Sequence, residues 1–124
     1  MPLCLAAGAA TAMLAVDAFT LAWVHSIEKT RWEEDWLVEG QQLVVVAARI
    51  RGSGAGMEPP PDAVLHAGVW QYRPQLPPLA RLVLANSPYA TRYELCLQDR
   101  CRPLHEYLRA APAEEALLLA PCAE

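Results

Sequence analysis

The densest group of chemically active side chains in this sequence lies between residues 25 and 36, in the segment HSIEKTRWEEDW. The segment contains one histidine, one serine, four acidic residues and two tryptophans. These residue types include general acids and bases, nucleophiles and metal ligands. Apolar sequence flanks the segment on both sides, so we expect strands of a buried sheet to position it.

His25 and Ser26 do not have the spacing of a nucleophile and its base. The preceding residues alternate as a strand does, so two adjacent side chains point to opposite faces, whereas a dyad needs both within hydrogen-bond reach. The favoured interpretation of His25 is a structural histidine at a strand end, paired with a carboxylate such as Glu28 or Glu34. Ser87 or another distant serine remains the other potential partner.

A metal centre is the second candidate, because the segment and its surroundings offer nitrogen and oxygen ligands. The potential ligands are His25, Glu28, Glu34, Asp35 and His66. Consecutive acidic residues on one strand cannot all face the same point, and acidic runs usually form solvated faces. We therefore favour a charged network with Lys29 and Arg31, and we predict no metal and no cofactor.

The third candidate is a binding loop in residues 51–62, RGSGAGMEPPPD. Its glycines, Gly52, Gly54 and Gly56, allow a close backbone approach and free N–H groups that suit an anion. The loop lacks the Lys-Ser/Thr ending of a phosphate-binding P-loop. A connection between two strands, with glycines at the turns, is the competing interpretation.

The elements that would position these residues are mostly short strands. The expected strands are 3–6, 12–16, 19–26, 32–38, 43–50, 81–85 and 92–97, with a hairpin over 63–72. Gly8 and Gly40 suit tight turns between strands. The valine-rich strand 43–50 is apolar on both faces, which indicates a central strand covered on both sides.

The C-terminal part differs from this pattern. Pro103 can open a short helix over 104–110, and EEALLLA predicts one or two helical turns in the tail. We expect a mostly-β domain over 1–110, a small antiparallel β-sandwich or open barrel with one short C-terminal helix, followed by a tail over 111–124.

Composition narrows the function classes. The chain has 124 residues, 54% of them hydrophobic, and a formal charge of −4, which favours one folded domain and argues against a nucleic-acid partner. The apolar start lacks the positively charged residues of a signal peptide. A cytoplasmic or membrane-associated location is therefore favoured, with the periplasmic side as the alternative.

The four cysteines, at 4, 96, 101 and 122, form no CxxC motif. If Gln98 and Asp99 form a two-residue turn, Cys96 and Cys101 lie opposite each other, close enough for a disulfide. Gln-Asp is a poor sequence for this turn, and reduced thiols are the alternative in a cytoplasmic protein.

The chain contains two distinctive blocks, first HSIEKTRWEEDW and then GSGAGMEPPPDAV. In these blocks and in their order it closely resembles a bacterial family known as domain of unknown function 1850. The resemblance extends from LCLAAG to CLQDRCRPLHEYL. Family members share a pattern that matches His25, Ser26, Glu28, Thr30, Glu34, Gly54 and Gly56. Many members have proline at the position of Arg31.

The resemblance implies a functional context, because members are often encoded beside TRAP transporters of the TAXI type, which combine a soluble solute receptor with a fused membrane permease. We therefore expect a non-enzymatic accessory or binding protein of such an uptake system. Its expected partners are the permease or the solute receptor, and a small anionic ligand. The alternatives are a small metal-dependent or hydrolytic enzyme built on His25, and a structural subunit whose N-terminal strands extend a partner's sheet.

The binding residues should converge on one surface, because the glycine loop follows a strand that pairs with the acidic strand. The predicted binding residues are His25, Ser26, Glu28, Thr30, Glu34, Gly52, Ser53, Gly54 and Gly56.

Overall fold

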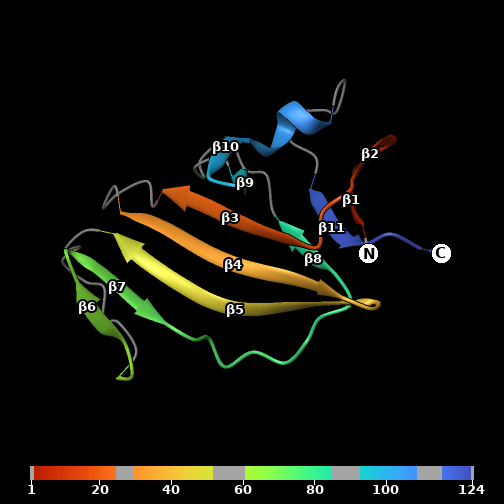
Figure 1. Cartoon of the computed structure of the whole chain (residues 1–124). Coiled ribbons are helices and arrows are strands. Elements are labelled where there is room, and N and C mark those ends of the chain that lie inside the picture. The colour runs from red at the N-terminus through yellow and green to blue at the C-terminus, as the bar shows by residue number, and fades with distance from the viewer. Residues whose placement is uncertain (1, 25–29, 52–60, 85–92, 109–115, 124) are drawn as a thin grey trace.

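The computed structural model describes residues 2–24, 30–51, 61–84, 93–108 and 116–123. They form two antiparallel sheets that share one hydrophobic core (Figure 1). The strand orders are β2-β1-β11-β8 in the smaller sheet and β10-β9-β3-β4-β5-β7-β6 in the larger. Both sheets are open at their edges. The predicted mostly-β antiparallel fold is thus confirmed, as a sandwich rather than a closed barrel.

The strand bounds agree closely with the predicted pattern up to residue 103. The smaller sheet contains β1 (Leu3–Ala7), β2 (Ala10–Leu14), β8 (Leu82–Leu84) and β11 (Leu117–Pro121). The larger sheet contains β3 (Ala18–Val24), β4 (Arg31–Glu39), β5 (Gln42–Arg51), β6 (Val64–His66), β7 (Val69–Tyr72), β9 (Glu94–Leu97) and β10 (Arg100–Pro103). A 3₁₀ helix, η1 (Leu104–Tyr107), follows β10.

The core forms where alternate residues of both sheets face each other. Leu3 and Leu5 of β1 and Leu119 of β11 are at most 1% exposed, and they belong to one cluster with Leu21 and Trp36 of the larger sheet. Burying a leucine of this kind contributes roughly 1.5–3 kcal/mol. The apolar residues that the sequence places at every second position therefore hold the two sheets together.

The C-terminal segment departs from the prediction. Residues 104–107 form a 3₁₀ helix instead of the start of an α-helix, and residues 109–115 lie outside the described residues. The tail does not form helical turns over 117–121. This segment is a strand between β1 and β8, because its alternate leucines fill the core, and tertiary packing overrides helix propensity.

The strand β5 is central, but it is not covered on both faces. Val44 and Val46 are only half-buried. Asp35 pairs with Ala47 and Trp36 pairs with Val45, so Val46 is the extra residue of a β-bulge. Such bulges re-aim neighbouring side chains. The outer face of β5 thus remains open to solvent and can contribute to a surface site.

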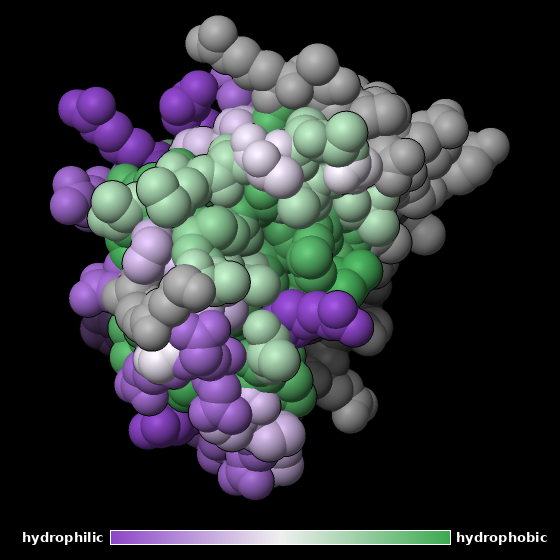
Figure 2. All heavy atoms as spheres, turned by 90° about the vertical axis from the view of Figure 1, so that its right-hand side faces the viewer, coloured by the Kyte–Doolittle hydropathy of each residue, from purple (hydrophilic) through white to green (hydrophobic). Residues whose placement is uncertain are grey.

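The outer face of the smaller sheet is apolar. Met13 of β2 is 68% exposed and Val83 of β8 is 63% exposed, with Ala6 and Leu118 half-buried on the strands between them. Figure 2 views the side where this sheet lies and shows hydrophobic residues across the centre of the face. Exposed apolar patches of this kind mark contact surfaces. In the described residues, no helix has the length and apolar character needed to cross a membrane.

The two ends of the chain are tied to each other. Cys4 and Cys122 form a disulfide with their Cα atoms 5.0 Å apart, and the Cys122 N–H donates to the Pro2 carbonyl at 2.9 Å. The bond connects β1 to the segment after β11. It therefore links two neighbouring strands of the smaller sheet, one from each end of the sequence.

Candidate functional site

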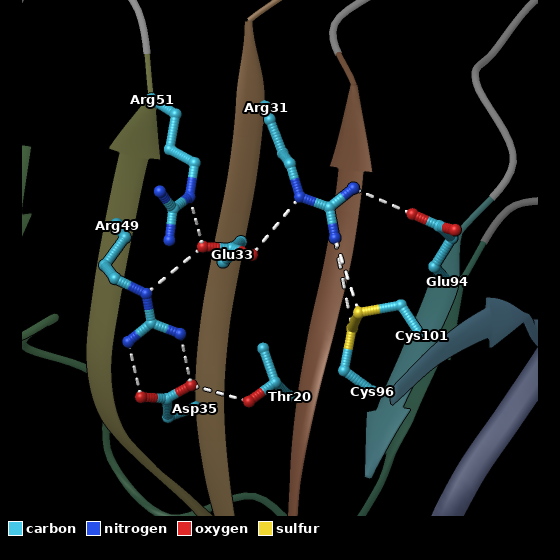
Figure 3. A network of polar contacts seen from close by, with 9 residues as sticks. All are labelled: Thr20, Arg31, Glu33, Asp35, Arg49, Arg51, Glu94, Cys96 and Cys101. Carbon is cyan, nitrogen blue, oxygen red and sulfur yellow. Dashed lines mark hydrogen bonds and ion pairs between the residues drawn. A yellow bond between two sulfur atoms is a disulfide. The ribbon is translucent and has the colours of Figure 1, made fainter. Parts of the chain in front are cut away.

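The outer face of the larger sheet carries a network of charged side chains (Figure 3). Its members come from five neighbouring strands, β10, β9, β3, β4 and β5. The network contains Thr20, Arg31, Glu33, Asp35, Arg49, Arg51, Glu94 and the Cys96–Cys101 disulfide.

Strand alternation and register bring these side chains together. Arg31, Glu33 and Asp35 follow one another at every second position of β4, so all three point to the same face. Arg49 lies directly opposite Glu33 on β5, and Thr20 lies opposite Asp35 on β3. Such cross-strand neighbours are close enough for hydrogen bonds.

Asp35 forms the best-aligned ion pair of the network. Arg49 donates from Nη1 to Oδ2 at 2.6 Å and from Nη2 to Oδ1 at 2.7 Å, a bidentate arrangement that fixes both side chains. The Thr20 hydroxyl donates to Oδ1 at 2.7 Å. The hydrogen bonds from Arg49 hold the pKa of Asp35 below its usual value despite partial burial, so Asp35 is a carboxylate at neutral pH.

Glu33 is shared by three guanidinium groups. Arg49 Nε and Arg51 Nε donate to Oε1 at 3.2 and 2.9 Å, and Arg31 Nε donates to Oε2 at 3.2 Å. Burial opposes ionisation of Glu33, but the three arginines outweigh it and lower its pKa. Three positive charges thus surround one nearly buried carboxylate.

Arg31 links this cluster to the β9–β10 hairpin. Its Nη1 donates to Glu94 Oε1 at 2.8 Å, and its Nη2 lies 3.5 Å from Cys101 Sγ and 3.9 Å from Cys96 Sγ. The hydrogen bond with Glu94 raises the pKa of Arg31 against the effect of burial. The guanidinium is therefore a fixed positive charge beside the disulfide.

A groove of about 980 Å³ lies over this face. Its lining includes two carboxylates of β4, Glu33 and Asp35, together with the two arginines of β5, the disulfide, and Val46 at the bulge. Both carboxylates are held ionised by arginine, so they are poor proton donors. In the described ranges, no three His, Cys, Asp or Glu side chains are grouped as metal ligands. The arrangement suits recognition of a charged group better than proton transfer.

Glu34 lies on the opposite face of the sheet, because its neighbours Glu33 and Asp35 point into the groove. On β4 it stands between Trp32 and Trp36, and Trp32 stacks on Trp23 with ring centroids 6.1 Å apart. Partial burial raises the pKa of Glu34. Glu34 is thus a carboxyl group in aromatic surroundings, separate from the arginine network.

The two kinds of carboxylate predict opposite pH effects on stability. The pKa of Glu34 is higher in the folded state than in the unfolded state. Its contribution to the stability of the fold is therefore fully present below the unfolded-state pKa, and it is lost as pH rises through the folded-state pKa. We expect Glu34→Gln to raise the free energy of unfolding at pH 7 relative to the wild type, with the difference vanishing toward pH 4. For Glu33, whose pKa is lowered, Glu33→Gln should lower stability at pH 7. Urea unfolding over this pH range measures both.

Of the nine predicted binding residues, the structure describes Thr30 and Glu34. Thr30 is 2% exposed and directly precedes β4, while Glu34 is half-buried. The other seven lie outside the described residues, namely His25, Ser26, Glu28, Gly52, Ser53, Gly54 and Gly56. Their convergence therefore stays a prediction.

The described strand ends next to these residues do adjoin. Val24 pairs with Arg31 across β3 and β4, and Arg31 pairs with Arg51 across β4 and β5. Val24 and Arg51, the last residues of β3 and β5, thus lie in the same row of the sheet, on either side of Arg31. The predicted pairing of the acidic strand with the strand that precedes the glycine loop is confirmed.

Several network residues were not predicted as site residues. Arg49 and Arg51 are two residues apart, as are Glu33 and Asp35. This matching spacing could have indicated that basic side chains on one strand pair with acidic side chains on the neighbouring strand. Of the predicted charged network with Lys29 and Arg31, the part with Arg31 is confirmed by the Arg31–Glu33 ion pair, and Lys29 lies outside the described residues. Glu94 carries no sequence signal, because its contact with Arg31 spans 63 residues.

Comparison with known proteins adds one assignment. The family model described as "Domain of unknown function (DUF1850)" matches residues 19–104. The match runs from the second residue of β3 to the first residue of η1, and so includes all of the larger sheet except Ala18. No curated protein and no solved structure matches the chain. The chain therefore belongs to the DUF1850 family.

Proposed function

We propose that this domain is a non-enzymatic accessory protein of a TRAP-type (TAXI) solute uptake system, and that it binds through the groove of the larger sheet. The expected partner is the permease or the solute receptor, which would present a carboxylate to the groove. A small anionic ligand would use the same contact. The transporter context rests on the family resemblance, and the binding surface rests on the arginine network.

The observation that carries the proposal is the position of Arg51. Its side chain is 50% exposed, compared with 21% for Arg49 and 28% for Arg31. Among the described residues, Glu33 is its acceptor, through Nε alone. Arg51 thus offers a guanidinium edge to a carboxylate from outside, and guanidinium groups bind carboxylates in bidentate geometry.

The rest of the network supports binding because it fixes the groove in advance. Arg49 and Asp35 hold each other in one geometry, and Glu33 anchors Arg51 at 2.9 Å. A side chain locked by its neighbours loses little conformational entropy when a partner binds. The charges at the groove are therefore preorganised for recognition.

The state of the cysteines supports a location on the periplasmic side. All four cysteines are paired in two disulfides. Disulfides persist in oxidising compartments and are rare in the cytoplasm. A domain in that compartment can meet the solute receptor as well as the outer surface of the permease.

Glu34 favours one alternative, a small metal-dependent or hydrolytic enzyme. A carboxyl group whose pKa is raised by burial is suited to general acid–base catalysis, and Glu34 is such a group. Metal binding to the full chain, measured by calorimetry with Zn²⁺ and Mn²⁺, tests this alternative. Tight stoichiometric binding that is lost in Glu34→Gln would favour it over the accessory role.

The accessory role is tested by affinity capture from gently solubilised membranes of the protein's own host. We expect the tagged wild-type domain to capture the TRAP permease or its solute receptor, identified by mass spectrometry. Arg51→Glu should reduce capture at least about tenfold, because it places a second negative charge beside Glu33 and repels the partner's carboxylate.

Arg81→Glu is the matched control, since Arg81 is exposed and precedes β8 of the smaller sheet. It makes the same change in net charge away from the groove and should leave capture unchanged. The proposal is wrong if neither transporter component is captured, or if both variants capture them as well as the wild type does.

A further inference from the structure

We propose that the Cys96–Cys101 disulfide is a thiol-exchange site, which reacts with the thiolate of an external dithiol and uses Arg31 to stabilise the departing sulfur. The inference concerns the chemistry of the groove wall and does not depend on the transporter role. Two observations carry it: the unequal exposure of the two sulfurs and the guanidinium beside them.

The two cysteines differ in access from solvent. Cys101 is exposed, whereas Cys96 is 6% exposed. They lie opposite each other on β9 and β10 with their Cα atoms 3.9 Å apart, and both line the groove. A reagent that enters the groove therefore reaches Cys101 Sγ first.

Arg31 is placed to assist the reaction. Figure 3 shows its guanidinium between two carboxylates, with Nη2 directed at the disulfide. Glu33 and Glu94 engage Nε and Nη1, so Nη2 is the nitrogen that faces the sulfurs, 3.9 Å from Cys96 Sγ and 3.5 Å from Cys101 Sγ. A positive charge beside a sulfur lowers the pKa of its thiol, and a thiol with a lower pKa leaves faster.

The exchange proceeds in two displacements. The external thiolate attacks Cys101 Sγ, a new S–S bond forms, and the Sγ–Sγ bond breaks with its electron pair passing to Cys96 as a thiolate. The second thiolate of the same reagent then attacks its own sulfur in the mixed disulfide and releases Cys101. The reagent is oxidised to a disulfide, Cys96 and Cys101 are reduced, and both end as thiols with the two protons that the dithiol supplies.

The second disulfide lacks these features and serves as an internal control. Cys122 is 6% exposed, Cys4 is half-buried, and in the described residues no guanidinium contacts either sulfur. A thiolate therefore reaches this bond less readily, and no described guanidinium assists the departing sulfur, so we expect slower reduction of Cys4–Cys122 under native conditions.

The test uses the full chain with dithiothreitol under native conditions, followed by alkylation at timed intervals and peptide mass spectrometry. We expect Cys96 and Cys101 to be alkylated at least about tenfold faster than Cys4 and Cys122. With glutathione at limiting concentration, the first mixed disulfide should form at Cys101 and not at Cys96. Both measurements use the wild-type protein, so neither depends on a variant that folds.

Variants then isolate the role of Arg31. Arg31→Gln should slow reduction of Cys96–Cys101 roughly tenfold and leave Cys4–Cys122 unchanged, while Arg31→Lys should retain part of the rate. Arg100→Gln removes a positive charge from the same hairpin, where Arg100 is exposed and neighbours Cys101, and should have little effect.

Two results would overturn the proposal. The first is equal reduction rates for the two disulfides, because the exposed sulfur would then confer no reactivity. The second is a mixed disulfide at Cys101 whose rate of formation is the same in Arg31→Gln as in the wild type. That result would show simple exposure without assistance from the guanidinium.

Discussion

Replacing both Cys4 and Cys122 with alanine should lower the free energy of unfolding by about 4–5 kcal/mol. The bond closes a loop of nearly the whole chain, with a sequence separation of 118, and loop-closure entropy for that length corresponds to about 5 kcal/mol. The bond also holds β1 and the end of β11 together, where residues from the two ends of the sequence meet. Equilibrium urea unfolding, followed by circular dichroism without reductant, measures the loss.

The double variant of Cys96 and Cys101 to alanine is the matched control. Its loop spans five residues, for which the same relation gives about 2 kcal/mol. The two double variants therefore separate the effect of loop length from the loss of two sulfurs. Equal losses would contradict this account of how the chain ends stabilise the fold.

Glu33→Ala should cost about 2 kcal/mol of stability. The variant leaves three guanidinium groups on one face without their common acceptor, and removing one member of a buried charged cluster typically costs about 3–5 kcal/mol. The arginine side chains keep 21% to 50% of their surface in water, so solvent screening reduces the expected loss. Thermal and urea unfolding at low and high salt measure it.

Glu39→Ala is the control for this prediction, because Glu39 ends the same strand and is exposed. Its expected effect is within about 0.5 kcal/mol. A loss of stability in Glu33→Ala as small as that in Glu39→Ala would show that Glu33 does not hold the arginine network together. Loss of the effect of Glu33→Ala in an Arg51→Ala background would assign the energy to that pair.

Most strands could be predicted from the sequence, because apolar alternation and turn residues act locally. Cys96 and Cys101 illustrate this, since a two-residue turn at Gln98 and Asp99 was enough to place them opposite each other. Both turn residues have positive φ, 51° and 67°, although neither is glycine. The disulfide and the hairpin register therefore hold a turn that the residues alone disfavour.

The rest required knowledge of which strands are neighbours. Leu117–Pro121 has helix-forming residues, and only its place between β1 and β8 makes it a strand. The groove likewise depends on β9 pairing with β3, which brings Glu94 to Arg31. Local patterns carry no information on such contacts between distant parts of the chain. The sequence therefore predicts Glu34 as a binding residue, whereas Glu33 and Asp35 line the groove together with two arginines of β5.

The most direct test of the central claim, that the groove is the binding surface for a transporter component, is site-specific photo-crosslinking in the host. A photoreactive residue at Val46, which lines the groove, should crosslink to the TRAP permease or its solute receptor. The same residue at Val83, which is 63% exposed on the smaller sheet, should not. Crosslinks to the transporter from Val83 and none from Val46 would contradict the account, because they would place the partner on the apolar sheet instead of the arginine groove.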